Sequence, residues 1–141
     1  MGAATYESVL ADAELLEHPE RWQQAHGDRP AWVFTHRDLP PVPGANITFA
    51  RGDIRQAHEA MVRAAGDRTI FVAGGGGLAA TFAEAELLDE IVVAVVPVML
   101  GEGKPLFGGR LSSSRLRLAK VEQKGQVVFL TYEVRNPPAA A

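Results

Sequence analysis

The sequence predicts an α/β fold with a mostly parallel central sheet, helices on its flanks and an antiparallel hairpin at its C-terminal end. Short apolar, β-branched runs alternate with segments of helical periodicity as far as residue 98, which is typical of parallel strands joined by helices. Two further strand-like segments, separated by a short turn, predict the hairpin. The chain has 141 residues, 47% of them apolar, so we expect one domain over 1–135 and a disordered tail over 136–141.

The first half of the chain is expected to hold helices followed by two short strands. Helical spacing begins at Thr5–Leu10, and Gly27–Pro30 breaks the chain before an apolar strand at Ala31–Thr35. A proline-rich connection, which cannot pair as a strand, leads to a second strand at Asn46–Ala50.

The next segment is expected to be an amphipathic helix with clear start and stop signals. Asp53 stands at the N-cap position and Gly66 at the C-terminal stop. Between them, one apolar stripe is formed by Ile54, Ala57, Met61, Val62 and Ala65.

The second half of the chain is expected to supply the interior of the sheet. Thr69–Ala73 and Ile91–Val96 are apolar on both strand faces, so we expect them to be neighbouring interior strands. Arg115–Glu122 and Val127–Val134 flank Lys124-Gly125 and form the expected hairpin.

Four consecutive glycines, Gly74 to Gly77, separate the strand expected at 69–73 from a helix that continues at Leu78. Such a junction exposes backbone N–H groups at the positive end of a helix dipole, and without Cβ atoms a phosphate can approach closely. The other interpretation is a tight turn with close helix–sheet packing. Four glycines exceed the needs of a turn, which favours an anion site.

Composition excludes several functional classes. The net charge is −3, so no general basic field attracts nucleic acid. Cysteine is absent and the histidines are scattered, which argues against a metal site. The longest apolar run, Ile91 to Leu100, is too short to cross a membrane, and no signal peptide is visible. We therefore expect a cytoplasmic protein that binds neither nucleic acid nor membrane.

Four segments together resemble the dihydrofolate reductase superfamily. Within it, they are most similar to the C-terminal reductase domain of the bifunctional riboflavin-biosynthesis deaminase–reductase. The segments are Met1–Glu7, the glycine loop Ala73–Gly76, Leu88–Glu90, and the block Pro97–Phe107. The last block, at its distance from the glycine loop, is the most specific, and the resemblance covers nearly the whole chain.

The resemblance implies a dihydrofolate reductase-like fold and an NADPH site. In that family the glycine loop lies against the cofactor pyrophosphate, the start of the first helix touches the cofactor phosphates, and the residues after the following strand face the 2′-phosphate. The positions that match here are Gly2, Thr5, Thr35, His36, Arg37, Gly74, Gly75, Gly76, Gly77 and Leu78. Ala3 and Ala4 stand where the family usually has a basic residue, so NADH is an alternative cofactor and Arg37 the expected partner of a 2′-phosphate.

The resemblance further implies an oxidoreductase: an NADPH-dependent reductase that transfers hydride to a small heterocycle, pterin-like or pyrimidine-like, as in riboflavin biosynthesis. Family members normally carry a segment before the first Met-Gly motif that lines the nicotinamide and substrate pocket. This chain begins at Met1-Gly2, so no catalytic residue is assigned. The alternative is a non-catalytic nucleotide-binding or interaction domain that keeps the scaffold without the pocket. A homodimer is expected, because an incomplete sheet leaves apolar surface to cover.

Overall fold

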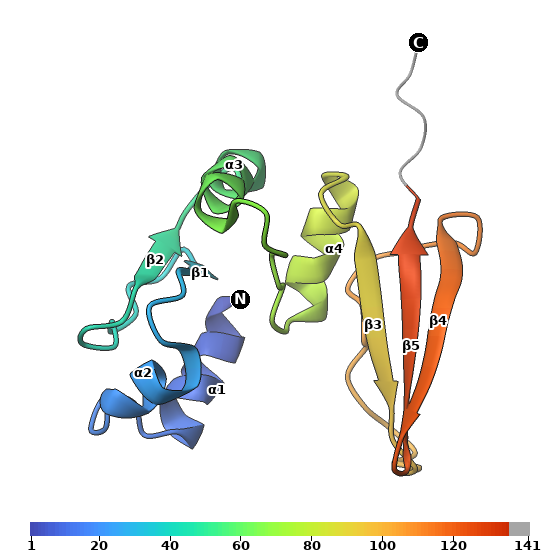
Figure 1. The fold of residues 1–141 in the computed structure, drawn as a ribbon, viewed down its shortest axis with the longest axis horizontal. Coiled ribbons are helices and arrows are strands. Elements are labelled where there is room, and N and C mark those ends of the chain that lie inside the picture. Colours follow the sequence, from blue (N-terminus) through green and yellow to red (C-terminus); the bar gives the residue numbers. More distant parts are fainter. Residues whose placement is uncertain (136–141) are drawn as a thin grey trace.

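A computed structural model describes residues 1–135, and the tail expected at 136–141 lies outside this range. Residues 1–135 run through nine elements, drawn in Figure 1, and the expected α/β class is confirmed. Their bounds are α1 Ala3–Asp12, α2 Glu20–His26, β1 Ala31–Phe34, β2 Ile47–Ala50, α3 Ile54–Ala65, α4 Gly76–Glu84, β3 Glu90–Val95, β4 Leu116–Lys124 and β5 Val127–Val134.

The N-terminal half is built on a parallel pair of strands. The sequence predicted both strands, and the structure pairs β1 with β2 in parallel, with Val33 opposite Phe49. Gly2 forms a parallel bridge with Phe34, and the Phe34 amide donates a 2.9 Å hydrogen bond to the carbonyl of Met1. The first two residues therefore lie beside β1, joined to it by this single bridge.

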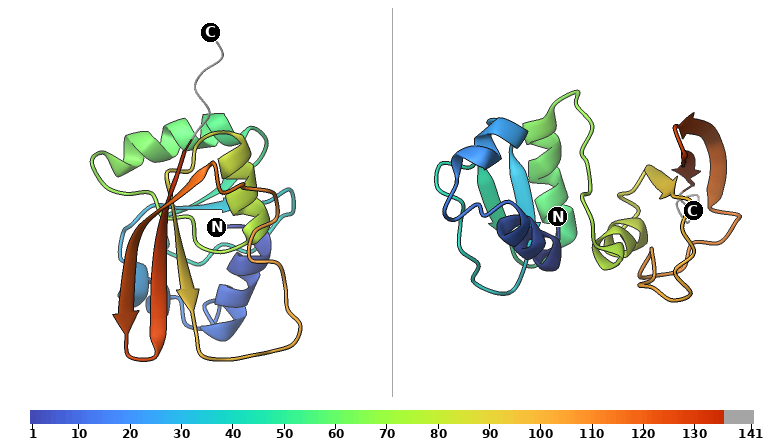
Figure 2. Two further views of the ribbon diagram at one scale, coloured as in Figure 1. Left: turned by 90° about the vertical axis from the view of Figure 1, so that its right-hand side faces the viewer. Right: turned by 90° about the horizontal axis from the view of Figure 1, so that it is seen from below.

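A hydrophobic core holds α1 and α2 against this pair. Figures 1 and 2 show both helices on one face of β1 and β2 and α3 on the other face. Tyr6 is fully buried, and its hydroxyl donates to the carbonyl of Pro40 at 2.8 Å, which anchors the proline-rich connection. The buried members of this core are Tyr6, Leu10, Leu15, Trp22, Val33 and Val42.

The ends of α3 are those that the sequence predicted. The Asp53 carboxylate accepts a hydrogen bond from the Arg55 amide at 2.8 Å and so caps the helix. Gly66 ends the helix with a φ of 58°, in the left-handed region that favours glycine.

The C-terminal half is an antiparallel sheet in the order β3-β5-β4. β4 and β5 form the expected hairpin, which turns at Gly125 with a φ of 60°. β5 is paired along both of its edges, and Figure 2 shows the three strands side by side.

Two expectations about the sheet are wrong. Thr69–Ala73 forms no strand, and β3 is an edge strand that pairs with β5 alone, so the two are not interior neighbours. Among the residues that the structure describes, parallel pairing is confined to β1, β2 and the Gly2 bridge. A strand needs a neighbouring backbone to bond with, and within residues 1–135 a cavity lies between 69–73 and β3 instead. Apolar side chains in both segments are exposed to solvent: Phe71 is 85% exposed and Val92 is 57% exposed.

The helix α4 lies between the two sheets (Figures 1 and 2). Its side chain Phe82 is 1% exposed and meets the ring of Phe34 edge-on, with centroids 5.7 Å apart. The ring of His58 on α3 also packs against Phe82 edge-on, with ring centroids 6.2 Å apart. This second core, which joins the halves, has as its buried members Met61, Phe82, Ala83, Leu88 and Val134.

Candidate functional site

The glycine loop leads into the N-terminus of α4. Gly75 occupies the N-cap position, where it offers no side-chain cap, and the first turn of α4 contains no acidic residue. The first N–H groups of a helix have no partner within the helix, and the dipole makes this end positive. The end of α4 is therefore suited to an anion.

Backbone geometry accounts for the first two glycines of the loop. Gly74 has a φ of 66° and Gly75 a φ of 80°, a conformation that other residues rarely adopt. A Cβ on Gly74 would also stand 2.8 Å from the Thr5 Oγ1 atom of α1. The loop and the start of α1 are thus in direct contact.

Close packing accounts for the third glycine. A Cβ on Gly76 would lie 2.5 Å from the carbonyl oxygen of Leu106, and the Gly108 amide donates to the Gly76 carbonyl at 2.9 Å. The loop after β3 therefore closes against the glycine loop. These are the two family segments whose spacing was most specific in the sequence.

Neither backbone geometry nor close packing requires a glycine at position 77. Its φ is not in the left-handed region, and a Cβ built on it would meet nothing within 4 Å. Glycine in a helix is less favourable than alanine by about 1 kcal/mol. Gly77 therefore leaves open space at the N-terminal turn of α4. A ligand could fit in this space.

The start of α1 has the same character as the start of α4. Gly2 caps α1 without a side-chain bond, and the first turn of α1 contains no acidic residue. Thr5 lies in this turn and faces Gly74. Two glycine-capped helix ends therefore meet, and both present positive dipole ends and backbone N–H groups.

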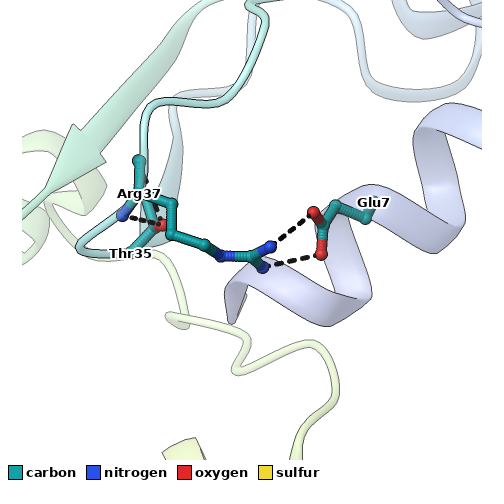
Figure 3. Close-up of polar contacts among 3 residues, drawn as sticks. All are labelled: Glu7, Thr35 and Arg37. Atoms are coloured by element: carbon teal, nitrogen blue, oxygen red, sulfur yellow. Dashed lines mark hydrogen bonds and ion pairs between the residues drawn. The ribbon is translucent and has the colours of Figure 1, made fainter.

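The segment after β1 is held in place by Thr35, which is 7% exposed. Its hydroxyl accepts a hydrogen bond from the Arg37 amide at 2.9 Å, forming a local turn. The guanidinium of Arg37 does not stand free: it binds both carboxylate oxygens of Glu7, at 2.9 and 2.7 Å (Figure 3). These bonds raise the pKa of the Arg37 guanidinium above its ordinary value, so the group stays charged.

The other two expected site residues differ in their surroundings. His36 is exposed in the segment that follows β1. Leu78 is half-buried and packs on the second core, so its environment is that of a packing residue.

Glu7 is the site residue that sequence reasoning missed. It lies within the Met1–Glu7 motif, which was the available signal, but its partner Arg37 is 30 positions away. Residues two apart on a helix do not share a face. Thr5 and Glu7 therefore place the glycine loop and Arg37 on different sides of the start of α1.

A cavity of about 1610 Å³ opens beside the glycine loop. It extends between 69–72 and β3, and its wall includes Gly74–Gly76 and Phe82. Pockets for small molecules usually measure about 300–1,000 Å³, so this cavity exceeds the size of one small ligand. The cavity has room beside the start of α4 for a larger molecule or for more than one.

No catalytic acid or base stands out among the described residues. Over residues 1–135 no group of three His, Asp or Glu side chains is placed to hold a metal ion. In the same range, none of the helices has the length and apolar character needed to cross a bilayer.

Comparison with known proteins identifies relatives over nearly the whole chain. The RibD C-terminal domain family matches residues 14–130. "Uncharacterized protein YwjB" of Bacillus subtilis (strain 168) is 30% identical over 132 residues, which cover 94% of this chain and 70% of that protein. "Uncharacterized protein YyaP" of the same organism is 48% identical over 40 residues, 28% of this chain and 21% of that protein.

Solved structures show a similar fold. A candidate riboflavin biosynthesis protein from Shewanella sp. PV-4 matches with a TM-score of 0.70 and 25% identity, over 96% of this chain and 72% of that one. A pyrimidine reductase-like protein from Corynebacterium diphtheriae has a TM-score of 0.55 and 16% identity, over 75% and 50% of the two chains, and shows the fold alone. The family match spans most of the chain and agrees with the fold, so this protein belongs to the RibD C-terminal domain family.

Proposed function

We propose that residues 1–135 form a single reductase domain that binds NADPH and transfers hydride to a small pterin-like or pyrimidine-like heterocycle. The observation that carries the proposal is the meeting of two glycine-capped helix ends, α1 and α4, with no acidic residue in either first turn. A pyrophosphate fits such a junction, because backbone N–H groups and both dipoles favour its negative charge.

The proposed cofactor site uses the residues that the sequence singled out. Gly74–Gly77 would hold the pyrophosphate with Gly2 and Thr5, while Thr35, His36 and Arg37 would face the adenosine ribose. When bound, the nicotinamide supplies the hydride, and the protein positions it. Membership of the RibD C-terminal domain family supports this chemistry. A reductase that uses a pyridine nucleotide and lacks cysteine fits the cytoplasm.

The first test measures binding and turnover separately. Fluorescence titration gives the affinities for NADPH and NADH, and loss of the reduced-nicotinamide absorbance reports turnover with a panel of pterins and aminopyrimidines. Nucleotide binding with oxidation that depends on one of these compounds supports the proposal. Binding without turnover favours the non-catalytic nucleotide-binding alternative, and no binding of either nucleotide contradicts both.

We predict that Gly77→Val weakens NADPH binding about tenfold, or about 1.4 kcal/mol, because a branched side chain would occupy the open space at the start of α4. Gly77 is the sharpest position to test, since a side chain at Gly75 would also strain the backbone. The matched control is Gly103→Val, whose position is equally open and also lacks a positive φ. Equal affinities in Gly77→Val and the parent protein would remove Gly77 from the site.

We predict that Arg37→Ala weakens NADPH binding about tenfold and leaves NADH binding nearly unchanged, since only NADPH carries the 2′-phosphate. Arg21→Ala is the control, because Arg21 forms a similar exposed ion pair, with Glu14, at 2.8 Å. Titration of both nucleotides measures the effect. A parallel loss of NADPH and NADH affinity would show that Arg37 supports the fold and has no part in selecting the phosphate.

We further propose a homodimer that covers the free edge of β3. Val92 is 57% exposed and Val95 48%, and an apolar edge strand readily pairs with another chain. Sedimentation at micromolar concentration should show the dimer, and Val92→Lys should shift it toward monomer. Val121→Lys is the control, because Val121 is 58% exposed on β4, at the opposite edge of the sheet. A monomeric parent protein would contradict the proposal.

A further inference from the structure

Glu7 is bound to Arg37, the residue that would hold a phosphate in the proposed site. We infer that Glu7 is a specificity-determining residue: its carboxylate competes with a ribose 2′-phosphate for Arg37 and so narrows the preference for NADPH over NADH. This inference rests on the proposed function and adds to it the residue that sets the choice between the two nucleotides.

The ion pair between Arg37 and Glu7 is bidentate. Arg37 donates from both terminal guanidinium nitrogens, Nη1 at 2.9 Å and Nη2 at 2.7 Å, to the two carboxylate oxygens of Glu7 (Figure 3). This fork is the same donor pair that grips a phosphate in a bidentate complex. A phosphate therefore has to displace Glu7 or share the guanidinium with it.

The backbone positions of Arg37 and Glu7 are both fixed, which keeps the two side chains within reach of each other. Its amide is held by the buried Thr35 hydroxyl at 2.9 Å, which fixes the backbone from which the side chain extends. Glu7 is held as firmly, because it lies in the middle of α1 next to the fully buried Tyr6. The two side chains thus start from fixed positions that bring them together.

A phosphate at Arg37 would lie close to the negative charge of the Glu7 carboxylate. A 2′-phosphate that reaches Arg37 also approaches the Glu7 carboxylate, and the two negative charges repel each other. The other acid of this segment, Asp38, forms its own ion pair with Arg51. Glu7 is therefore the carboxylate bound to Arg37 and the one whose removal should matter.

The exposure of the ion pair limits how much Glu7 can change the affinity for NADPH. The side chains of Arg37 and Glu7 are 59% and 42% exposed, so water and salt screen their attraction. Exposed pairs of this kind are weak, which corresponds to a change of about two- to fivefold in affinity. Competition should therefore reduce the affinity for NADPH without abolishing it.

NADH should respond differently. Its adenosine ribose carries hydroxyl groups, which can donate hydrogen bonds to a carboxylate, the role that an acidic residue plays in many NAD sites. A glutamine at position 7 keeps an acceptor oxygen but loses the charge. The exchange should therefore favour NADPH selectively.

The test is Glu7→Gln, with Glu14→Gln as the matched control. Glu14 also pairs with an arginine, Arg21, at 2.8 Å on the exposed surface, but beyond the C-terminal end of α1. We expect Glu7→Gln to tighten NADPH binding about two- to fivefold at low salt and to leave NADH unchanged, with a smaller gain at high salt. In the Arg37→Ala background the gain should shrink, because the competition acts through Arg37.

Each other outcome overturns the inference in a recognisable way. If the parent binds NADPH but Glu7→Gln leaves that affinity unchanged or lowers it, Glu7 does not compete for Arg37. If both nucleotides shift together, Glu7 acts on the fold of α1, which the unfolding midpoint of the variant would also report. If the parent and all variants bind neither nucleotide, the proposed function itself fails and the inference fails with it.

Discussion

The two sheets share no ladder of backbone hydrogen bonds, so side-chain packing around Phe82 has to hold the molecule together. Phe82 on α4 touches Phe34 of β1 and His58 of α3, and the same core includes Ile91 and Val134 of the C-terminal sheet. Burying a phenylalanine contributes about 1.5–3 kcal/mol. The position of α4, and with it the glycine loop, depends on this contact.

The candidate site exists because three segments distant in sequence meet at the start of α4. Thr5 of α1 fills the space beside Gly74, and Leu106 of the loop after β3 lies against Gly76. Neither contact tolerates a Cβ, so the glycines are needed for packing as well as for any ligand. The fold therefore explains three of the four glycines, and Gly77 alone needs another reason.

Local signals in the sequence were sufficient for much of this architecture. The cap at Asp53, the stop at Gly66 and the turn at Gly125 each depend on one residue type in one conformation, and the structure has all three. The glycine loop could be placed for the same reason. The resemblance to a known family then indicated which segments would adjoin the loop.

What the sequence could not provide were the relations between distant segments. The apolar run at 69–73 has the composition of a buried strand, but strand formation depends on a partner backbone that composition does not reveal. β3 was misplaced for the same reason. The pairing of Glu7 with Arg37 spans 30 positions and involves two exposed side chains, so neither periodicity nor spacing marks it.

The uneven pairing of the strands has a consequence for local stability. β5 is bonded along both edges, whereas 69–73 contributes to neither sheet. Amide hydrogens exchange with solvent when their bonds open, and their protection follows the free energy of that opening. Protection should therefore rise from the segment that precedes the glycine loop, through the singly paired β3, to the centre of β5. A ligand bound beside the glycine loop should therefore raise the protection of residues 69–72, which line the neighbouring cavity.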